Sequence, residues 1–166
     1  MSGSNAPPAG AVPNGLDDEA VARRQRWMAA LARAATADLE THWAAIGADV
    51  GYRFLRAPEC GLAMVRGRAG GSGGRFNLGE MTVTRCSVRL DDGRVGHAYV
   101  AGRDRRHAEL AAAFDALLQN PARQAEIARE VIEPLENARA AARCRRSRKA
   151  AATKVDFFTM VRGEDT

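Results

Sequence analysis

Apolar residues near the start of the chain recur with the spacing of an amphipathic helix. Val21, Trp27, Met28 and Leu31 fall roughly on one face of a helix over residues 17–34. The acidic residues at positions 17–19 suit its N-terminal end, because the helix dipole favours negative charge there. Residues 1–15 are rich in glycine, proline and alanine and have no apolar period, so we expect them to form a disordered leader.

A second helix is predicted directly after the first. Thr36 is a suitable N-cap, and Leu39, Trp43 and Ile46 recur on one face and should point inward. We expect this helix to stop at Gly47, where glycine would adopt the left-handed conformation that ends many helices.

The middle of the chain changes to short runs rich in β-branched and aromatic residues. These runs cover residues 52–56, 62–66, 81–90 and 95–100, and they predict an antiparallel sheet of short strands. Asp91-Asp92-Gly93 predicts a hairpin turn between the last two runs, since glycine takes positive φ at no steric cost. A two-residue and a three-residue loop would give different cross-strand partners, so the register stays open.

Helical spacing returns in the last third of the chain. One helix is predicted over residues 104–119, and Asn120-Pro121 is a favoured N-cap and first-turn pair for another. Pro134 lies inside this second helix and should kink it or divide it in two. The residues expected to face inward are Leu110, Phe114 and Leu117, then Ile127, Val131, Leu135 and Ala138.

The final segment, residues 153–163, is predicted to be a strand that needs cover on both faces. Phe157 faces one way along a strand, whereas Phe158 and Met160 face the other. The segment is therefore either a central strand of its own sheet or a docking element for another chain, with Arg162 as a further interface candidate. The whole pattern predicts an α+β fold, a single domain of residues 16–166 in which helices from both ends flank an antiparallel sheet.

Composition favours a protein that works with a partner. Of the 166 residues only 5% are aromatic and much of the apolar content is alanine, so the core should be thin. The three cysteines, at positions 60, 86 and 144, are far apart and contain no C-x-x-C pair, which favours reduced thiols. No signal peptide or membrane-spanning run is visible, so we expect a soluble, cytoplasmic protein.

The net charge of +5 permits anionic ligands without choosing among them. Arg103, Asp104 and His107 lie at a strand-to-helix junction, where unpaired N–H groups favour an anion. Asp104 could instead cap that helix itself, and His107 shares the apolar stripe of the helix, which is more typical of packing. Arg85 and Arg89 share a strand face with Ser87 and could present paired cations to a phosphate or to an acidic subunit; the alternative is a solvated sheet face.

Other segments indicate less. The glycine-rich residues 70–74 lack a following Gly-Lys-Ser/Thr, so a mobile hairpin loop is favoured over a phosphate-binding loop. His42 has no companion at ligand spacing, and we expect no metal site in this chain. The basic run from Arg139 to Lys149 resembles a nucleic-acid footprint by charge, but no aromatic residue is interleaved for stacking. A solvated or partner-facing helix end is favoured there.

Five segments together resemble one family, the PhnG family, which forms the G subunit of the bacterial carbon–phosphorus lyase core complex. The match runs from about Arg24 to the C-terminus, and the second segment below resembles the first hairpin of the family. The segments are Arg24-x-x-Trp27-Met28; Arg56-Ala57-x-Glu59-x-Gly61-Leu62; Thr84-Arg85 through Val88-Arg89-Leu90-x-Asp92-Gly93; Gly102-Arg103-Asp104-x-x-His107-Ala108-Glu109 followed by Asp115-Ala116-Leu117; and residues 155–163.

The resemblance implies an accessory subunit of a transferase, alpha-D-ribose 1-methylphosphonate 5-triphosphate synthase. Such a subunit acts with H, I and L partners, most directly the I subunit, to displace adenine from ATP with a phosphonate. Cleavage of the carbon–phosphorus bond follows on the J subunit. ATP and the phosphonate are then substrates of the complex, and this chain alone is expected to bind no cofactor. A small basic regulator that binds nucleic acid through residues 139–149 is the alternative.

Overall fold

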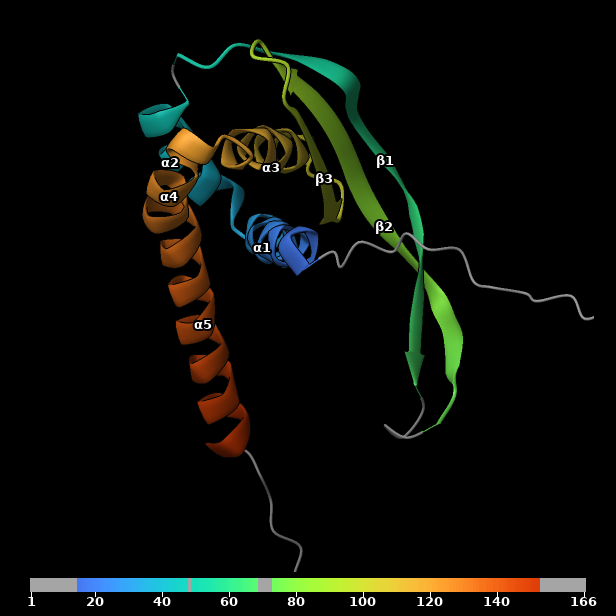
Figure 1. Cartoon of the computed structure of the whole chain (residues 1–166). Coiled ribbons are helices and arrows are strands. Elements are labelled where there is room, and N and C mark those ends of the chain that lie inside the picture. The colour runs from blue at the N-terminus through green and yellow to red at the C-terminus, as the bar shows by residue number, and fades with distance from the viewer. Residues whose placement is uncertain (1–14, 48, 69–72, 153–166) are drawn as a thin grey trace, which may run out of the picture.

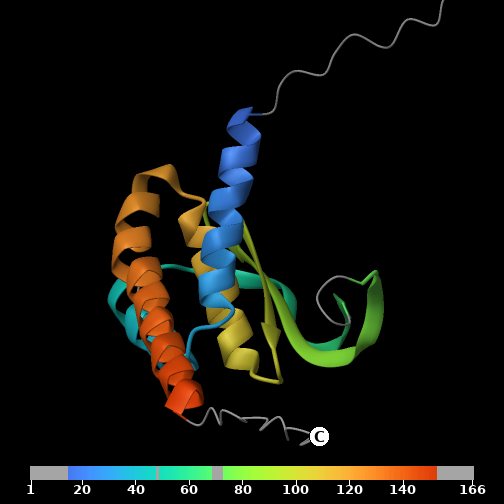
Figure 2. The same ribbon diagram turned by 90° about the horizontal axis from the view of Figure 1, so that it is seen from below.

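A three-stranded antiparallel sheet with helices packed on one face forms the molecule (Figure 1). The computed structural model describes residues 15–47, 49–68 and 73–152. Helices from both ends of the chain lie on the same side of the sheet, as the turned view also shows (Figure 2). The predicted α+β fold is therefore confirmed. The elements are α1 (Gly15–Leu31), α2 (Thr36–Ile46), β1 (Tyr52–Arg68), β2 (Arg75–Leu90), β3 (Val95–Ala101), α3 (Arg105–Leu118), α4 (Pro121–Ile127), the π-helix η2 (Ala128–Ile132) and α5 (Glu133–Ala152).

The sheet has fewer and longer strands than predicted. The expected strands 52–56 and 62–66 are one strand, β1, which pairs with β2 along its length, so the hairpin expected at residues 56–62 is wrong. Pro58 lies within β1, which is an edge strand, where the missing N–H of proline breaks no ladder bond. Register shifts between Phe54 and Arg56 and between Arg56 and Glu59 absorb the irregular stretch. The glycine-rich segment connects β1 to β2, as predicted, and its mobility stays a prediction.

The turn between β2 and β3 fixes the register that the sequence left open. Leu90 N–H donates to the carbonyl of Arg94, which closes a three-residue loop, and Gly93 in this loop has φ of 92°. Arg85 therefore lies opposite Tyr99, and Ser87 lies opposite His97.

Helix α3 forms the centre of the core, against β2 and β3. Residues 110–118 are all buried, and the inward-facing side chains of β2 include Cys86, Val88 and Leu90. The backbones of α3 and β3 meet at Gly96, where a Cβ atom would lie 2.0 Å from the carbonyl oxygen of Ala112. Alanines along α3 permit this close approach, so the thin core reflects a tight helix–sheet contact.

The ends of the N-terminal helices differ from the prediction in detail. Thr36 is the first residue of α2 and does not cap it; its hydroxyl donates instead to Asp104, 2.6 Å away. Gly47 has φ of −100°, so it is not left-handed. Glycine fits there because a Cβ atom would lie 2.5 Å from the Trp43 ring. Val21, expected to face inward on α1, is 51% exposed.

Pro134 interrupts the C-terminal helix without ending it. The π-helix η2 directly precedes it, and the N–H of Glu133 bonds to the carbonyl of Ala128, five residues back. This wider turn accommodates the proline, which cannot donate to the preceding turn. The extra residue also shifts the buried face, so that Ile132 is buried while Ala138, expected to face inward, is exposed.

Candidate functional site

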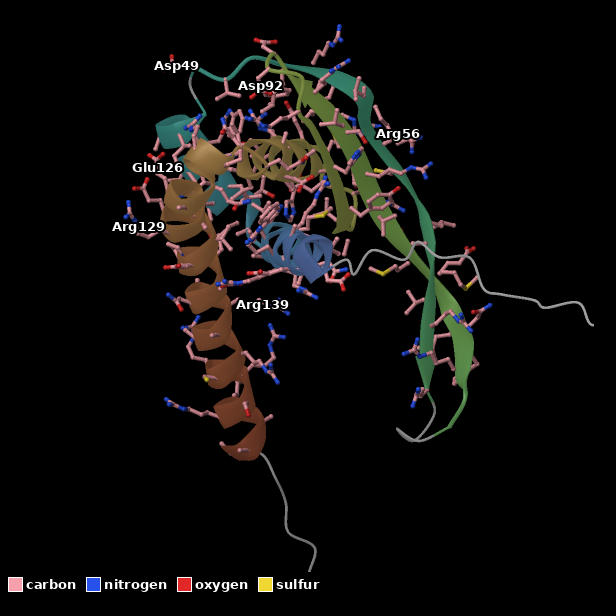
Figure 3. The ribbon with its side chains drawn as sticks, in the orientation of Figure 1. Asp49, Arg56, Asp92, Glu126, Arg129 and Arg139 are labelled. Atoms are coloured by element: carbon pink, nitrogen blue, oxygen red, sulfur yellow. The ribbon has the colours of Figure 1, made fainter. Side chains whose placement is uncertain are left out.

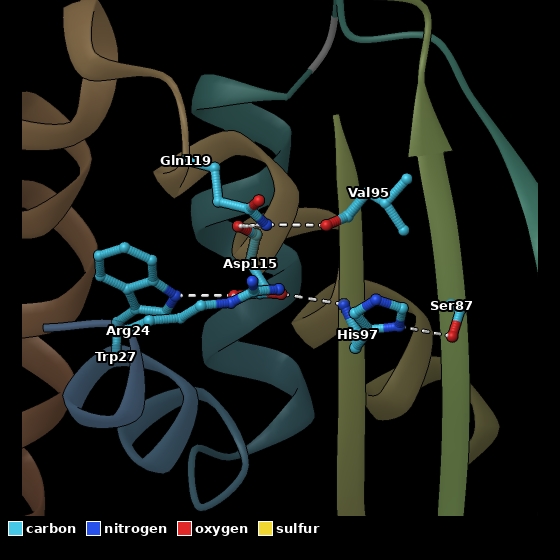
Figure 4. A network of polar contacts seen from close by, with 7 residues as sticks. All are labelled: Arg24, Trp27, Ser87, Val95, His97, Asp115 and Gln119. Carbon is cyan, nitrogen blue, oxygen red and sulfur yellow. Dashed lines mark hydrogen bonds and ion pairs between the residues drawn. The ribbon is translucent and has the colours of Figure 1, made fainter. Parts of the chain in front are cut away.

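A buried carboxylate on α3 holds three elements together (Figure 4). Asp115 is fully buried and accepts hydrogen bonds from Arg24 at 2.7 and 3.1 Å, from the Trp27 indole at 2.8 Å and from the backbone N–H of His97 at 2.9 Å. Gln119 donates to the carbonyl of Val95, so α3 also covers the outer edge of β3. Three residues that carried the family resemblance, Arg24, Trp27 and Asp115, therefore have a structural role.

The junction between β3 and α3 is occupied by the protein's own groups. Asp104 accepts hydrogen bonds from the His107 N–H at 2.9 Å and from the Thr36 hydroxyl, and these two bonds lower the pKa of its carboxyl. His107 is buried, and its ring lies 2.8 Å from the carbonyl oxygen of Leu31. The side chains of Asp104 and His107 are thus already engaged in contacts within the protein, which favours a structural role over a ligand role. Arg103 is exposed and stays a ligand-binding candidate.

The face of the sheet away from the helices is polar and hollowed. Alternation along β2 turns Arg85, Ser87 and Arg89 to this face, as predicted, while Thr84, Cys86 and Val88 point into the core. A cavity of about 380 Å³ opens beside them, here called the sheet hollow. Its lining residues are Leu55, Arg56, Arg85, Cys86, Ser87, His97 and Tyr99.

Charged groups in the sheet hollow are organised by one glutamate. Glu59 accepts from Arg85 at 2.7 Å and lies 3.3 Å from Arg56. Beside them, the Ser87 hydroxyl and the His97 ring nitrogen Nδ1 are 2.8 Å apart, a pair that Figure 4 shows bridging β2 and β3. Two cations, a serine hydroxyl and a histidine ring therefore line one cavity.

A second pair of arginines lies next to the hollow. Arg53 on β1 and Arg89 on β2 are directly opposite each other, and neither has an ion pair among the described residues. Like charges directly opposite on a sheet repel. The open face thus holds positive charge that the described part of the chain does not neutralise.

The distal part of the β1–β2 ribbon, residues 61–68 and 75–83, extends past α1 and α3 (Figure 1) and is called the arm. Large apolar side chains on it are exposed, including Leu62 at 66% and Leu78 at 59%. Exposed apolar surface gathered on one element is typical of protein contact sites. The other exposed apolar residues of the arm are Met64, Phe76 and Met81.

Helix α5 carries the basic run outside the core. Its arginines at positions 139, 143, 145, 146 and 148 are exposed, and Figure 3 shows Arg139 on the projecting part of the helix. No described helix is both long and apolar enough to cross a membrane. Among residues 15–47, 49–68 and 73–152, no three histidine, cysteine or carboxylate side chains are grouped to hold a metal ion, and His42 is half-buried on α2.

Sequence reasoning missed His97, Tyr99 and Arg56 as members of a site. The alternation in β3 could have indicated the first two, because Gly96, Ala98 and Val100 occupy the other face. Alternation along β1 could not place Arg56, because the register shifts on both sides of this residue. The C-terminal candidates Phe157, Phe158, Met160 and Arg162 lie outside the described residues.

Comparison with known proteins gives a consistent result over nearly the whole chain. The family described as phosphonate metabolism protein PhnG matches residues 22–163. A protein of Rhizobium meliloti (strain 1021) is 49% identical over 150 residues, which are 90% of this chain and 95% of that protein. That relative is named alpha-D-ribose 1-methylphosphonate 5-triphosphate synthase subunit PhnG.

Proposed function

The chain belongs to the PhnG family of phosphonate metabolism proteins, and we propose that it is the G subunit of an alpha-D-ribose 1-methylphosphonate 5-triphosphate synthase. The enzyme transfers the ribose triphosphate moiety of ATP to a phosphonate and releases adenine. This chain is an accessory subunit, and the complex works in the cytoplasm. The observation that carries the proposal is the 49% identity to a subunit of that name across almost the full length of both proteins.

The partners in this proposal are the H, I and L subunits, with the I subunit in most direct contact and the J subunit acting later. The arm supports a subunit role, because a two-stranded ribbon is only marginally stable alone and here exposes Leu62, Met64 and Leu78. Arginines at positions 66, 68 and 75 border its tip. We therefore propose that the arm binds a partner subunit, in an apolar groove that is flanked by carboxylates.

The proposed function is tested by reconstitution. The full chain is co-expressed with the H, I and L subunits, and adenine release from ATP is measured with methylphosphonate present. We expect phosphonate-dependent adenine release that disappears when this chain is omitted. An assembly of the other three subunits that is equally active without this chain would contradict the proposal.

The arm contact is tested by two polar substitutions on one strand face. Leu62→Ser combined with Met64→Ser should reduce co-purification with the partner subunits at least tenfold and leave the unfolding midpoint of the isolated chain unchanged. Val21→Ser is the matched control, because Val21 is an apolar residue of similar exposure on α1. Equal co-purification of the arm variant and the control would remove the arm from the interface.

The C-terminal candidates Phe157, Phe158, Met160 and Arg162 belong to the same proposal as partner-interface residues. Phe157→Ala combined with Phe158→Ala should weaken assembly while α3 and the sheet retain their stability. If the isolated variant loses stability and still assembles when folded, the segment instead completes the subunit's own structure. Size-exclusion chromatography of the co-expressed complex separates these results.

A further inference from the structure

We infer that the sheet hollow binds the phosphate or phosphonate group of a ligand through Arg56, Arg85, Ser87, His97 and Tyr99. The inference deepens the proposed function and rests on it for the choice of ligand, since the synthase named for the relative handles a triphosphate and a methylphosphonate. The ligand class is a small oxyanion with several acceptor oxygens. A cavity of about 380 Å³ is of the size that such ligands occupy.

The two cations of the hollow retain most of their donors. Glu59 engages Nε of Arg85 and Nη1 of Arg56, whereas each guanidinium carries five N–H groups. Glu59 therefore orients both arginines, and most of their N–H groups remain available to a ligand. Guanidinium groups bind phosphate oxygens in pairs, which favours an oxyanion over a single acceptor.

Two further polar side chains, His97 and Tyr99, have groups available to a ligand. The Nδ1 atom of His97 contacts Ser87, and Nε2 of the same ring has no partner among the described residues. Tyr99 is 60% exposed, and its hydroxyl likewise has no hydrogen bond within the described part of the chain. Within the described part of the chain, the carboxylate that contacts the arginines of the hollow is Glu59, which both arginines share. An entering oxyanion therefore meets guanidinium donors and a net positive charge.

The hollow is built on a firm support. The backbone N–H of His97 donates to the buried Asp115, and Ser87 and Arg85 lie on β2 between two paired strands. Side chains carried by paired strands lose little freedom when a ligand binds, which favours affinity. Arg53 and Arg89, opposite each other on the same face near the turn between β2 and β3, raise the local concentration of anions.

Binding of inorganic tripolyphosphate and of methylphosphonate to the full chain, measured by isothermal titration calorimetry at low salt, tests the inference. Arg56→Gln combined with Arg85→Gln should weaken tripolyphosphate binding at least tenfold, and His97→Gln should weaken it several-fold. Arg139→Gln combined with Arg143→Gln, which removes the same two charges from exposed α5, should leave it unchanged. Circular dichroism confirms that each variant is folded.

Three results would overturn the inference. One is unchanged binding in the double variant, and another is an equal loss in the control, which would indicate attraction by net charge alone. The third is loss of tripolyphosphate binding when partner subunits assemble, because the face would then be a protein interface. In each case the adenine-release assay tests the proposed function separately. If the complex is active and requires this chain, the subunit role holds even though the sheet hollow does not bind the ligand.

Discussion

At the scale of single residues, one carboxylate carries an unusual share of the structure. Asp115 joins α1, α3 and β3 through Arg24, Trp27 and the backbone of His97. A carboxylate can be buried only when charge and hydrogen bonds compensate the loss of water, and here every buried side-chain oxygen and nitrogen of the described residues has a partner.

Replacing Asp115 with alanine should destabilise the chain by about 3–5 kcal/mol, because Arg24, the Trp27 indole and a strand N–H lose their acceptor. The measurement is the free energy of unfolding in urea. Glu126→Ala, an exposed carboxylate on α4, should stay within about 0.5 kcal/mol of the wild type. Similar values for the two variants would refute the structural role of Asp115.

Because the thiol of Cys86 is buried, we expect the free energy of unfolding to fall at alkaline pH. Burial raises its pKa from 9.0 to about 11, so the unfolded chain releases this proton first. The stabilisation is complete below about pH 9 and is lost as the pH rises towards 11. Urea midpoints at pH 8 and pH 10.5 should therefore differ less in Cys86→Ala than in the wild type. Cys144→Ala, at an exposed position, should keep the wild-type difference.

At the scale of elements, the contact between α3 and β3 sets the thickness of the core. Gly96 allows the helix backbone to approach the strand, and α3 in turn satisfies two backbone groups on the outer edge of β3. This arrangement places His97 and Tyr99 on the opposite face of the same strand. The contact with α3 and the lining of the sheet hollow therefore both depend on the register of β3 against β2.

Gly96→Ala should lower the free energy of unfolding by about 1–3 kcal/mol or more, because the new methyl group meets backbone atoms that cannot rotate away. Gly61→Ala is the matched control, since a Cβ atom there meets nothing within 4 Å. Thermal unfolding of both variants tests this. Equal melting temperatures would show that α3 moves freely over β3.

At the scale of the whole molecule, two parts extend from a small core. The arm and α5 lie on opposite sides of the core and extend from it in roughly the same direction (Figure 1). The exposed apolar residues gather on the arm, whereas the exposed arginines gather on α5. The two projections thus offer different chemistry to partners.

Hydrogen exchange should separate the core from the arm. Amides of α3 should exchange slowly, whereas amides of residues 61–68 and 75–83 should exchange within minutes because few contacts oppose local opening. Assembly with partner subunits should slow amide exchange in the arm at least tenfold and leave the exchange rates of α3 unchanged. If the arm is already as protected as α3 in the isolated chain, it does not need a partner for stability.

Local patterns in the sequence determined several features directly. The caps at Asp104 and Asn120, the turn at Gly93 and the outward face of Arg85, Ser87 and Arg89 follow from rules that act over a few residues. The combination of motifs also identified the family. Neighbouring residues alone decide these features, so the sequence was sufficient for them.

Tertiary structure alone decided the features that join distant segments. The continuous β1, the burial of Asp115 and the gathering of Arg56, Ser87 and His97 in one cavity depend on strand pairing and helix packing across dozens of residues. The stretch between the two predicted strands contains Pro58 and Gly61, whose local preferences oppose a strand, and pairing with β2 outweighed those preferences. Such competition is settled by the free energy of the whole fold.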